Sequence, residues 1–211
     1  AFEMETALGF WYFRQKKCDI VVLETGMGGL LDATNLVEGT LAAVIPSVSR
    51  DHMKFLGDTL GEIAVQKAGI IKAGCHVAAG ALEPEALKVV AERAALLGCP
   101  LHLFRREDLS HVRYGLEKQC FDYGKRKGVE ISLAGQYQVE NAGVALEALD
   151  ILAEQGFPVA EEKLRQGMLR ARWPGRFTLV GRKPFFIVDG AHNEDAVRRL
   201  VQSLEFYFKG R

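Results

Sequence analysis

CDIVVLETGMGGLLDATN, residues 18–35, is the stretch on which the expected fold depends. Ile20 to Leu23 form a continuous apolar run rich in β-branched side chains, which is typical of a parallel strand buried on both faces. Glu24 follows, and the glycines of residues 26–29 then allow the backbone to approach a ligand closely. Ligands of open α/β sheets bind outside the carboxyl ends of the strands. The stretch therefore predicts a strand over residues 19–24 that ends in a binding site.

Helices and strands alternate in the pattern of the first 104 residues. The expected helices cover residues 2–17, 58–68 and 84–97, and the expected strands cover residues 19–24, 41–48, 75–79 and 100–104. This alternation indicates an α/β fold, a mostly parallel sheet with helices on both faces. The first expected helix has more apolar residues than one narrow stripe can hold. We therefore expect the rest of the fold to cover most of its surface.

The pattern changes after residue 104. Short strands are expected at 112–114, 119–123 and 129–133, as an antiparallel addition at the sheet edge, followed by helices over 137–154 and 160–169. Pro174-Gly175 is typical of a turn. A strand pair (178–180 and 185–188), a loop and a helix from residue 194 to about 208 then predict the start of a second α/β domain.

We therefore expect a central domain at residues 1–172 and the start of a second domain at 173–211. The second would hold roughly 35 structured residues, fewer than the ~40 that usually fold without help. The chain also starts with alanine inside an expected helix. Both observations lead us to expect a fragment of a longer protein.

The charge balance and the cysteines restrict the class of protein. Lys and Arg number 27 and Asp and Glu number 27, so net charge gives no reason to expect nucleic acid or an acidic membrane as partner. No apolar run approaches the roughly 20 residues that span a bilayer. The four cysteines are far apart in sequence and form no CxxC, which argues against zinc and favours reduced thiols in the cytoplasm.

Glu24 and His52 both follow expected parallel strands, where neighbouring strands would bring them within reach of one ion. Mg²⁺ takes few protein ligands and completes its shell with water and substrate phosphates. The alternative is that Glu24 caps a helix and His52 is an ordinary surface histidine, and spacing alone favours this alternative.

Lys67 lies in the expected helix 58–68, among apolar neighbours. Burial lowers the pKa of a lysine, and the neutral amine is reactive. Most helix lysines are solvated, however, and spacing alone favours that interpretation here. The glycines of residues 26–29 match neither GxGxxG nor GxxxxGK[ST], so a close-packed loop is favoured over a phosphate cradle. Residues 189–193 fit a ligand-facing loop or an Asx-type turn equally well.

Five segments together resemble the folylpolyglutamate synthase/dihydrofolate synthase family, within the Mur-ligase superfamily. They are LETGMGGLLDATN (23–35), DHMKFLGDTLGEIAVQKAGIIKAG (51–74), GQYQVENA (135–142), WPGRF (173–177) and DGAHN (189–193). Their order and spacing match the family across nearly the whole chain. The resemblance implies the P-loop-type central domain of a Mur ligase for residues 1–172 and the glutamate-ligase domain for the remainder.

The resemblance implies an ATP-dependent ligase that adds L-glutamate to dihydropteroate or folylpolyglutamate. ATP would phosphorylate a carboxylate of the substrate, and the amino group of glutamate would attack the acyl phosphate. The implied cofactor is Mg²⁺, and the implied partners are ATP, glutamate and a folate or dihydropteroate. We expect the parent protein to be a cytoplasmic monomer.

The resemblance also implies roles for individual residues. Glu24, His52 and Lys67 would be Mg²⁺ ligands, Lys67 after carbon dioxide has converted its amine into a carbamate anion. The other implied positions are Lys67 and His192 for catalysis, Asn141, Arg176 and Asp189 for ATP, and Phe2, Asp32 and Ala33 for the folate.

Several positions depart from the family pattern. Leu30 stands where Arg is usual, Gln66 where Glu is usual, Tyr137 where His is usual and Glu194 where Pro is common. The glycine-rich ATP loop is absent from the 211 residues. We therefore expect no ligase activity from this chain alone. Two alternatives stay open: a non-catalytic remnant that binds a folate or nucleotide, and another Mur-type amino-acid ligase.

Overall fold

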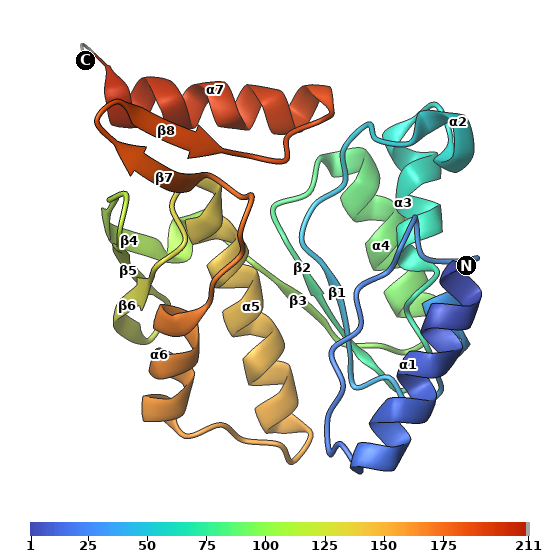
Figure 1. Cartoon of the computed structure of the whole chain (residues 1–211). Coiled ribbons are helices and arrows are strands. Elements are labelled where there is room, and N and C mark those ends of the chain that lie inside the picture. The colour runs from blue at the N-terminus through green and yellow to red at the C-terminus, as the bar shows by residue number, and fades with distance from the viewer. Residues whose placement is uncertain (210–211) are drawn as a thin grey trace.

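The computed structural model describes residues 1–209, and a parallel sheet lies near the centre of the molecule (Figure 1). Within the described residues this sheet has three strands in the order β1 (Ala42–Ile45), β2 (His76–Ala79) and β3 (Leu101–Leu103). Both pairs of neighbours are parallel. The strands lie within the ranges predicted from the sequence, and each is shorter than its predicted range.

Helices cover both faces of this sheet, as the sequence pattern predicts. α3 (Leu60–Ala68) and α4 (Pro84–Leu96) pack on one face, in a core that contains the fully buried Ile63 and Val90. α5 (Tyr137–Glu154) lies on the other face and contacts all three strands. The α/β class with a parallel sheet and helices on both faces is therefore confirmed.

α3 begins at Leu60 because Thr59 and Glu62 form a capping box. Thr59 Oγ1 accepts a 3.1 Å hydrogen bond from the Glu62 backbone N–H, and Glu62 Oε2 accepts one of 3.0 Å from the Thr59 N–H. Two N–H groups that the helix leaves unpaired are thereby satisfied. The predicted helix over residues 58–68 is confirmed, and the capping box makes Leu60 its first residue.

A second, antiparallel sheet is formed by β4 (Leu109–Arg113), β5 (Gln119–Tyr123) and β6 (Arg126–Ile131). It is separate from the parallel sheet, so the prediction of an addition at that sheet's edge is wrong. α5 carries the buried Val139 and Leu146 into the core beneath these strands, and α6 (Glu161–Arg170) packs against β6. α5 thus separates the two sheets (Figure 1), and the antiparallel strands have their own apolar core.

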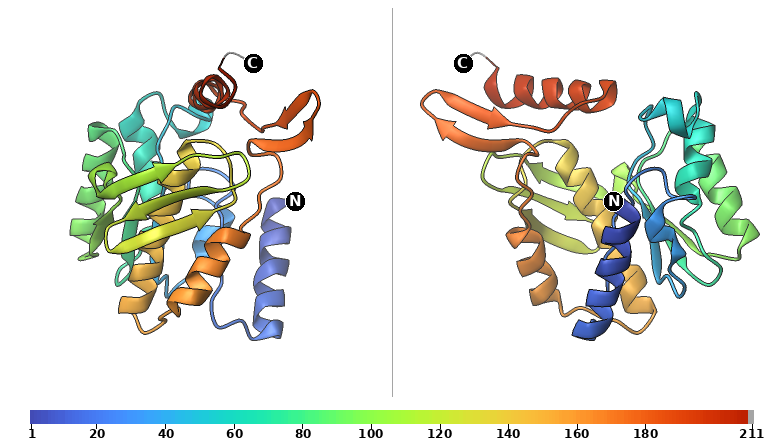
Figure 2. Two further views of the ribbon diagram at one scale, coloured as in Figure 1. Left: turned by 90° about the vertical axis from the view of Figure 1, so that its left-hand side faces the viewer. Right: turned by 45° about the vertical axis from the view of Figure 1, so that its right-hand side comes forward.

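The C-terminal part is a hairpin of β7 (Thr178–Arg182) and β8 (Phe185–Val188), followed by α7 (Glu194–Phe208). Figure 2 shows this unit lying across one end of the molecule. Phe177, at its start, is buried, and its ring lies 5.4 Å from that of Tyr207 in α7. These elements match the predicted ones, and the division into two domains at residue 173 stays a prediction.

Two predictions about the N-terminal part are wrong. α1 (Phe2–Lys16) is a helix as predicted, but its side chains are exposed or half-exposed, and Trp11 is 58% exposed. Within residues 1–209 the segment 19–24 forms no strand, and Val22 is 93% exposed. A strand needs backbone partners beside it as well as an apolar sequence, and among the described strands none pairs with this segment.

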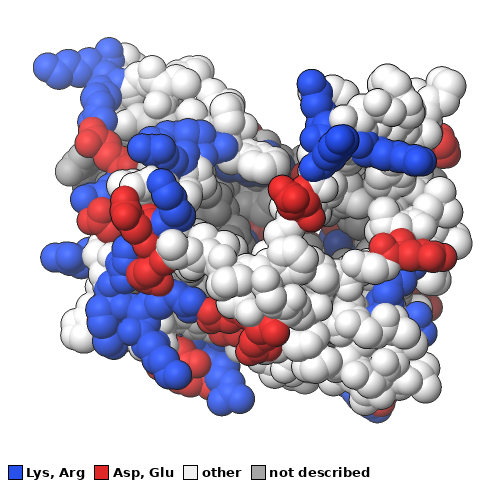
Figure 3. All heavy atoms as spheres, turned by 90° about the horizontal axis from the view of Figure 1, so that it is seen from below, with Lys and Arg blue, Asp and Glu red and all other residues white. Residues whose placement is uncertain are grey.

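Short helices over 33–36, 53–56 and 106–108 were not predicted. No helix among residues 1–209 has both the length and the apolar character needed to cross a bilayer. Acidic and basic side chains are interspersed on the face shown in Figure 3, in keeping with equal numbers of both in the sequence.

Candidate functional site at the carboxyl end of the parallel sheet

A cavity of about 440 Å³ lies where the three parallel strands end. Its lining includes Pro46, Gly80 and Phe104, which directly follow β1, β2 and β3. The carboxyl end of such a sheet is the usual position of a ligand site. α5, the loop of residues 24–28 and the first turn of α7 complete the wall.

The glycine loop fits closely against the C-terminal end of α3. A Cβ at Gly29 would lie 2.8 Å from the Gln66 carbonyl oxygen and 2.8 Å from Ile70 Cγ2. The Leu30 backbone N–H donates a 2.8 Å hydrogen bond to the same carbonyl. This geometry supports the prediction of a close-packed loop. The loop holds the end of α3, which carries Lys67, against the cavity.

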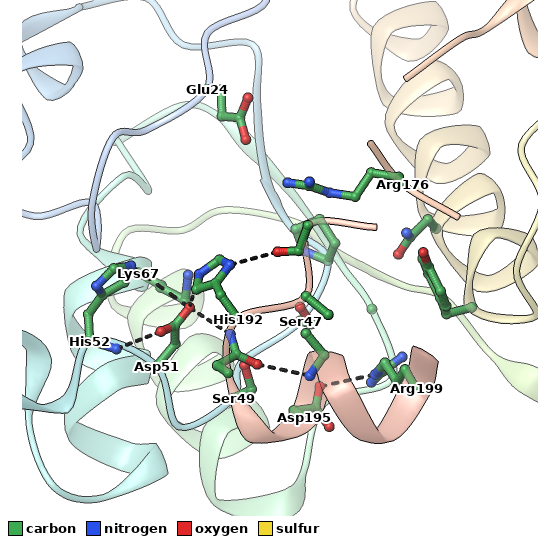
Figure 4. Close-up of a pocket in the computed structure, with 18 of the residues that line it drawn as sticks. Glu24, Ser47, Ser49, Asp51, His52, Lys67, Arg176, His192, Asp195 and Arg199 are labelled. Carbon is green, nitrogen blue, oxygen red and sulfur yellow. Dashed lines mark hydrogen bonds and ion pairs between the residues drawn. The ribbon is translucent and has the colours of Figure 1, made fainter. Parts of the chain in front are cut away.

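Asp51 is the residue on which the polar contacts of the cavity converge (Figure 4). Its Oδ1 accepts a 2.8 Å hydrogen bond from the His52 backbone N–H, and its Oδ2 accepts one of 2.8 Å from Asn193 Nδ2. The Nε2 atoms of His52 and His192 each lie 3.8 Å from Asp51 Oδ2. Asp51 therefore connects the loop after β1 with the start of α7.

Asp51 was not among the residues predicted from the sequence. The available signal was a carboxylate beside His52, a few residues after a predicted strand. Ligand atoms of Asp51, His52 and His192 all lie within 4.8 Å of one another. One carboxylate and two imidazoles are a donor set that can hold a divalent cation.

Lys67 reaches the same cavity from the last turn of α3. It is partly buried, and burial lowers the pKa of its ammonium, an effect that the negative charge of Asp51 opposes. Figure 4 shows Lys67 beside Asp51 and His52. A lysine in this position has a larger neutral fraction than a solvated one, which contradicts the solvated interpretation that spacing alone favours.

Glu24 also lines the cavity, but Figure 4 shows it apart from the group around Asp51. The three predicted metal ligands, Glu24, His52 and Lys67, thus share one cavity. The tightest cluster of possible ligand atoms there contains His52 with Asp51 and His192 instead. The predicted ligand set stays a prediction.

Asn141, Arg176 and Asp189, the predicted ATP contacts, line the cavity too. Asn141 Nδ2 donates a 3.0 Å hydrogen bond to Gln138 Oε1 one turn earlier in α5. The guanidinium of Arg176 points into the cavity in Figure 4. Arg176 Nη1 would lie only 2.4 Å from a Cβ at Gly190, so the glycine leaves the space that this side chain occupies.

Asp189 holds the two loops of the C-terminal unit together. Its Oδ2 accepts a 2.6 Å hydrogen bond from the Phe177 backbone N–H, and its Oδ1 accepts one of 2.8 Å from the Ala191 N–H. Tyr137 donates a longer bond of 3.4 Å to Oδ2. Burial and the negative charge of Asp189 raise the pKa of Tyr137 to about 12, so its hydroxyl stays protonated at neutral pH.

The three predicted folate contacts lie outside the cavity lining that residues 1–209 form. Phe2 and Asp32 meet beside Gly26, whose Cβ would lie 2.7 Å from the Phe2 ring and 3.1 Å from Asp32 Oδ2. Ala33 begins the short helix of residues 33–36, which Asp32 caps through the backbone N–H of Thr34. Their predicted role is untested by this geometry.

Comparison with known proteins gives a family match. Residues 3–149 match the family described as the Mur ligase middle domain. Over 98% of its length the chain is 38% identical to folylpolyglutamate synthase from Lacticaseibacillus casei and 39% identical to dihydrofolate synthase/folylpolyglutamate synthase from Bacillus subtilis. It covers 50% of each, so it spans about half the length of these relatives.

Solved structures are similar over the same extent. A structure described as an FPGS–AMPPCP–folate complex superposes with a TM-score of 0.92 at 36% identity, over 99% of this chain and 52% of that one. Folylpolyglutamate synthase from Thermotoga maritima gives a TM-score of 0.83 at 38% identity, over 99% and 48%.

Proposed function

The chain belongs to the Mur ligase middle-domain family, and from this premise we propose that it forms the ATP- and metal-binding part of a folate ligase. The proposed reaction adds L-glutamate to dihydropteroate, to folylpolyglutamate, or to both. The similarity to a structure described as an FPGS–AMPPCP–folate complex supports ATP and a folate as ligands. Glutamate is proposed from the names of the relatives.

One observation carries the proposal: a single cavity gathers polar side chains from the loop after β1, from α3, α5 and the C-terminal unit. Lys67, Arg176 and His192 can meet anionic phosphates there, while Asp51 orients the histidines around it. These cationic side chains and the Asp51 carboxylate lie together at the end of the sheet. Such an arrangement is suited to phosphoryl transfer, which depends mainly on positioning the substrates and stabilising their charge.

The proposed chemistry has two steps. A carboxylate oxygen of the folate attacks the γ-phosphorus of ATP, so that a C–O–P bond forms and ADP leaves. The amino nitrogen of glutamate then attacks the acyl carbon, which forms the amide, releases inorganic phosphate and frees a proton from nitrogen. We propose that Arg176 binds phosphate oxygens and that His192 is a catalytic residue next to the reacting groups. Asp189 fixes the two loops that carry Arg176 and His192.

The donor set suits Mg²⁺ only in part. Magnesium prefers oxygen ligands, and the Asp51 group supplies one carboxylate and two imidazoles. A carbamate on Lys67 would add oxygens, and Glu24 lines the same cavity but lies apart from this group. When bound, Mg²⁺ would offset the charge of the phosphates and orient them.

We propose that Lys67 is carbamylated. The pKa lowered by burial supports this, because only the neutral amine attacks carbon dioxide. ¹³C NMR of the protein in ¹³C-bicarbonate should show a carbamate carbonyl signal that Lys67→Arg removes. Lys72→Arg is the matched control. The Lys72 ammonium donates a hydrogen bond to the Asn35 carbonyl, so Lys72 should not carry a carbamate. A signal that survives Lys67→Arg would refute the assignment.

Calorimetry tests the proposed ligands directly. Mg²⁺–AMPPCP and a reduced folate are titrated separately into the 211-residue chain. The proposed contact between Arg176 and the phosphates would be supported if the chain binds the nucleotide and Arg176→Ala weakens that binding by about tenfold to a hundredfold. Heat from neither ligand would refute the proposal.

We further propose that the chain alone turns over no substrate, because GxxxxGK[ST] is absent from its 211 residues and the phosphates lack that cradle. Phosphate release from ATP, Mg²⁺, glutamate and a folate would overturn this.

Leu30 and Gln66 favour a second candidate, a folate- or nucleotide-binding module without chemistry. The parent protein is proposed to be a monomer, and the free cysteines support a cytoplasmic location.

A further inference from the structure

A second cluster of possible metal ligands lies at the opposite end of β2 from the cavity. His76 is the first residue of β2, and His102 lies in the middle of β3. The register pairs His102 with Ala78, so His76 and His102 project from the same face of the sheet. Val77 and Ala79 belong to the core on the other face. The histidines therefore face α5, whose last residue is Glu154.

The three ligand atoms form a nearly equilateral triangle. His76 Nδ1 lies 3.4 Å from His102 Nε2, and each of these nitrogens lies 3.5 Å from Glu154 Oε2. A tetrahedral Zn²⁺ with bonds of roughly 2.0–2.1 Å places its ligand atoms roughly 3.3–3.4 Å apart. The triangle thus has the size of one face of a zinc coordination tetrahedron.

The second nitrogen of His102 has a carboxylate beside it. His102 Nδ1 lies 3.9 Å from Glu147 Oε2, and Tyr123 donates a 2.6 Å hydrogen bond to Glu147 Oε1. Histidines that bind metals usually direct their other N–H towards a carboxylate, which fixes the tautomer and the ring orientation. At 3.9 Å this pair is an ion-pair contact and not a hydrogen bond, so Glu147 can accept the His102 N–H only after a small side-chain movement.

We propose that His76, His102 and Glu154 bind one Zn²⁺ ion, with water as fourth ligand. The side chains of the two histidines are 22% and 21% exposed and that of Glu154 is 53% exposed, so an ion can enter from solvent. The ion joins β2 and β3 to the C-terminal end of α5. It therefore stabilises the packing of α5 on the sheet, independently of any ligase chemistry.

Zn²⁺ affinity is measured by competition with a chromophoric chelator. The measurements use a background variant, His52→Ala with His192→Ala, so that the cluster in the cavity cannot contribute. The background variant is expected to bind one Zn²⁺ and to melt at a higher temperature with Zn²⁺ than without it. His102→Gln and Glu154→Gln should each weaken binding by more than about tenfold. Glu147→Gln should weaken it by about 10–100-fold if it orients His102.

His111→Ala is the matched control, because His111 is exposed and pairs with Asp122 away from the cluster. Co²⁺ in place of Zn²⁺ should give the strong visible absorption of a tetrahedral site. It should lack the near-ultraviolet thiolate band that the buried pair Cys75 and Cys99 would produce. Glu154→Gln guards against misfolding, because Glu154 is half-exposed at a helix end. The proposal is overturned if the background variant binds no Zn²⁺, or if Glu154→Gln and His102→Gln leave its affinity unchanged.

Discussion

Asn193 Nδ2 donates a 2.8 Å hydrogen bond to Asp51 Oδ2 across 142 residues of sequence. The other end of the same amide caps α7, because Asn193 Oδ1 accepts a 2.9 Å hydrogen bond from the Ala196 backbone N–H. One side chain therefore starts a helix and attaches that helix to the end of the parallel sheet. His192 lies beside it, so this bond also determines where His192 sits relative to Asp51.

Two substitutions at Asn193 should separate the cap from the attachment. Asn193→Ser keeps a good N-cap but removes the donor to Asp51, and we expect a loss of about 0.5–1.5 kcal/mol in unfolding free energy. Asn193→Asp also keeps the cap but places a second carboxylate beside Asp51, so it should cost more. Urea unfolding measures both. The attachment would be refuted if Asn193→Asp were as stable as the native chain.

Lys67 should make the stability depend on pH in the alkaline range. Its folded-state pKa is lowered from the usual 10.5, mainly by burial, so the unfolded chain binds the proton more tightly. Folding is then disfavoured below the lowered pKa, and this penalty disappears as pH rises through the window up to about 10.5.

Lys67→Met should therefore stabilise the protein at pH 7, and its advantage should shrink towards pH 10.5. The measurement is urea unfolding of both proteins in buffer free of carbon dioxide. Lys72→Met is the control, because Lys72 donates a hydrogen bond to the Asn35 carbonyl and its removal should destabilise. A constant difference between Lys67→Met and the native chain at all pH values would contradict the argument.

The sequence predicted well those elements whose stability is local or whose apolar pattern is complete. α5 has the predicted bounds, Tyr137–Glu154, because apolar residues recur at helical spacing and are buried between two sheets. α3 (Leu60–Ala68) lies within its predicted range of residues 58–68, because a capping box formed by neighbouring residues starts it. The apolar run of residues 20–23 failed as a strand because strand formation also depends on a neighbouring backbone, which no local pattern encodes.

The position of the candidate site was easier to predict from the sequence than the side chains that meet there. A cavity does lie where the parallel strands end, and all five predicted catalytic and ATP-contact residues line it, although their roles stay predictions. Asp51 was missed because its importance comes from His192 and Asn193, which approach only when the chain has folded. The His76–His102–Glu154 cluster was missed for the same reason, because strand register and the end of α5 bring it together.

Gly190→Ala should displace the guanidinium of Arg176 from its position in the cavity, although Arg176 itself is unchanged. The added Cβ would lie 2.4 Å from Arg176 Nη1, and the flexible end of the arginine can move away at little cost to the fold. If the native chain binds Mg²⁺–AMPPCP, Gly190→Ala should lower the affinity by about tenfold to a hundredfold, as Arg176→Ala does. Calorimetry on the double variant provides the control. It should be no weaker than either single variant, and additive losses would show that the two residues act separately.

Gly29→Ala should loosen the end of α3 that carries Lys67. The added methyl group would lie 2.8 Å from the Gln66 carbonyl oxygen, which is backbone and cannot move without shifting the helix. Overpacking of this kind costs about 1–3 kcal/mol. Gly167→Ala is the matched control, because Gly167 lies inside α6 with nothing within 4 Å of an added Cβ. There alanine should stabilise by about 0.5–1 kcal/mol through its helix propensity. Equal effects of the two substitutions on urea unfolding would mean that the glycine loop does not hold α3 in place.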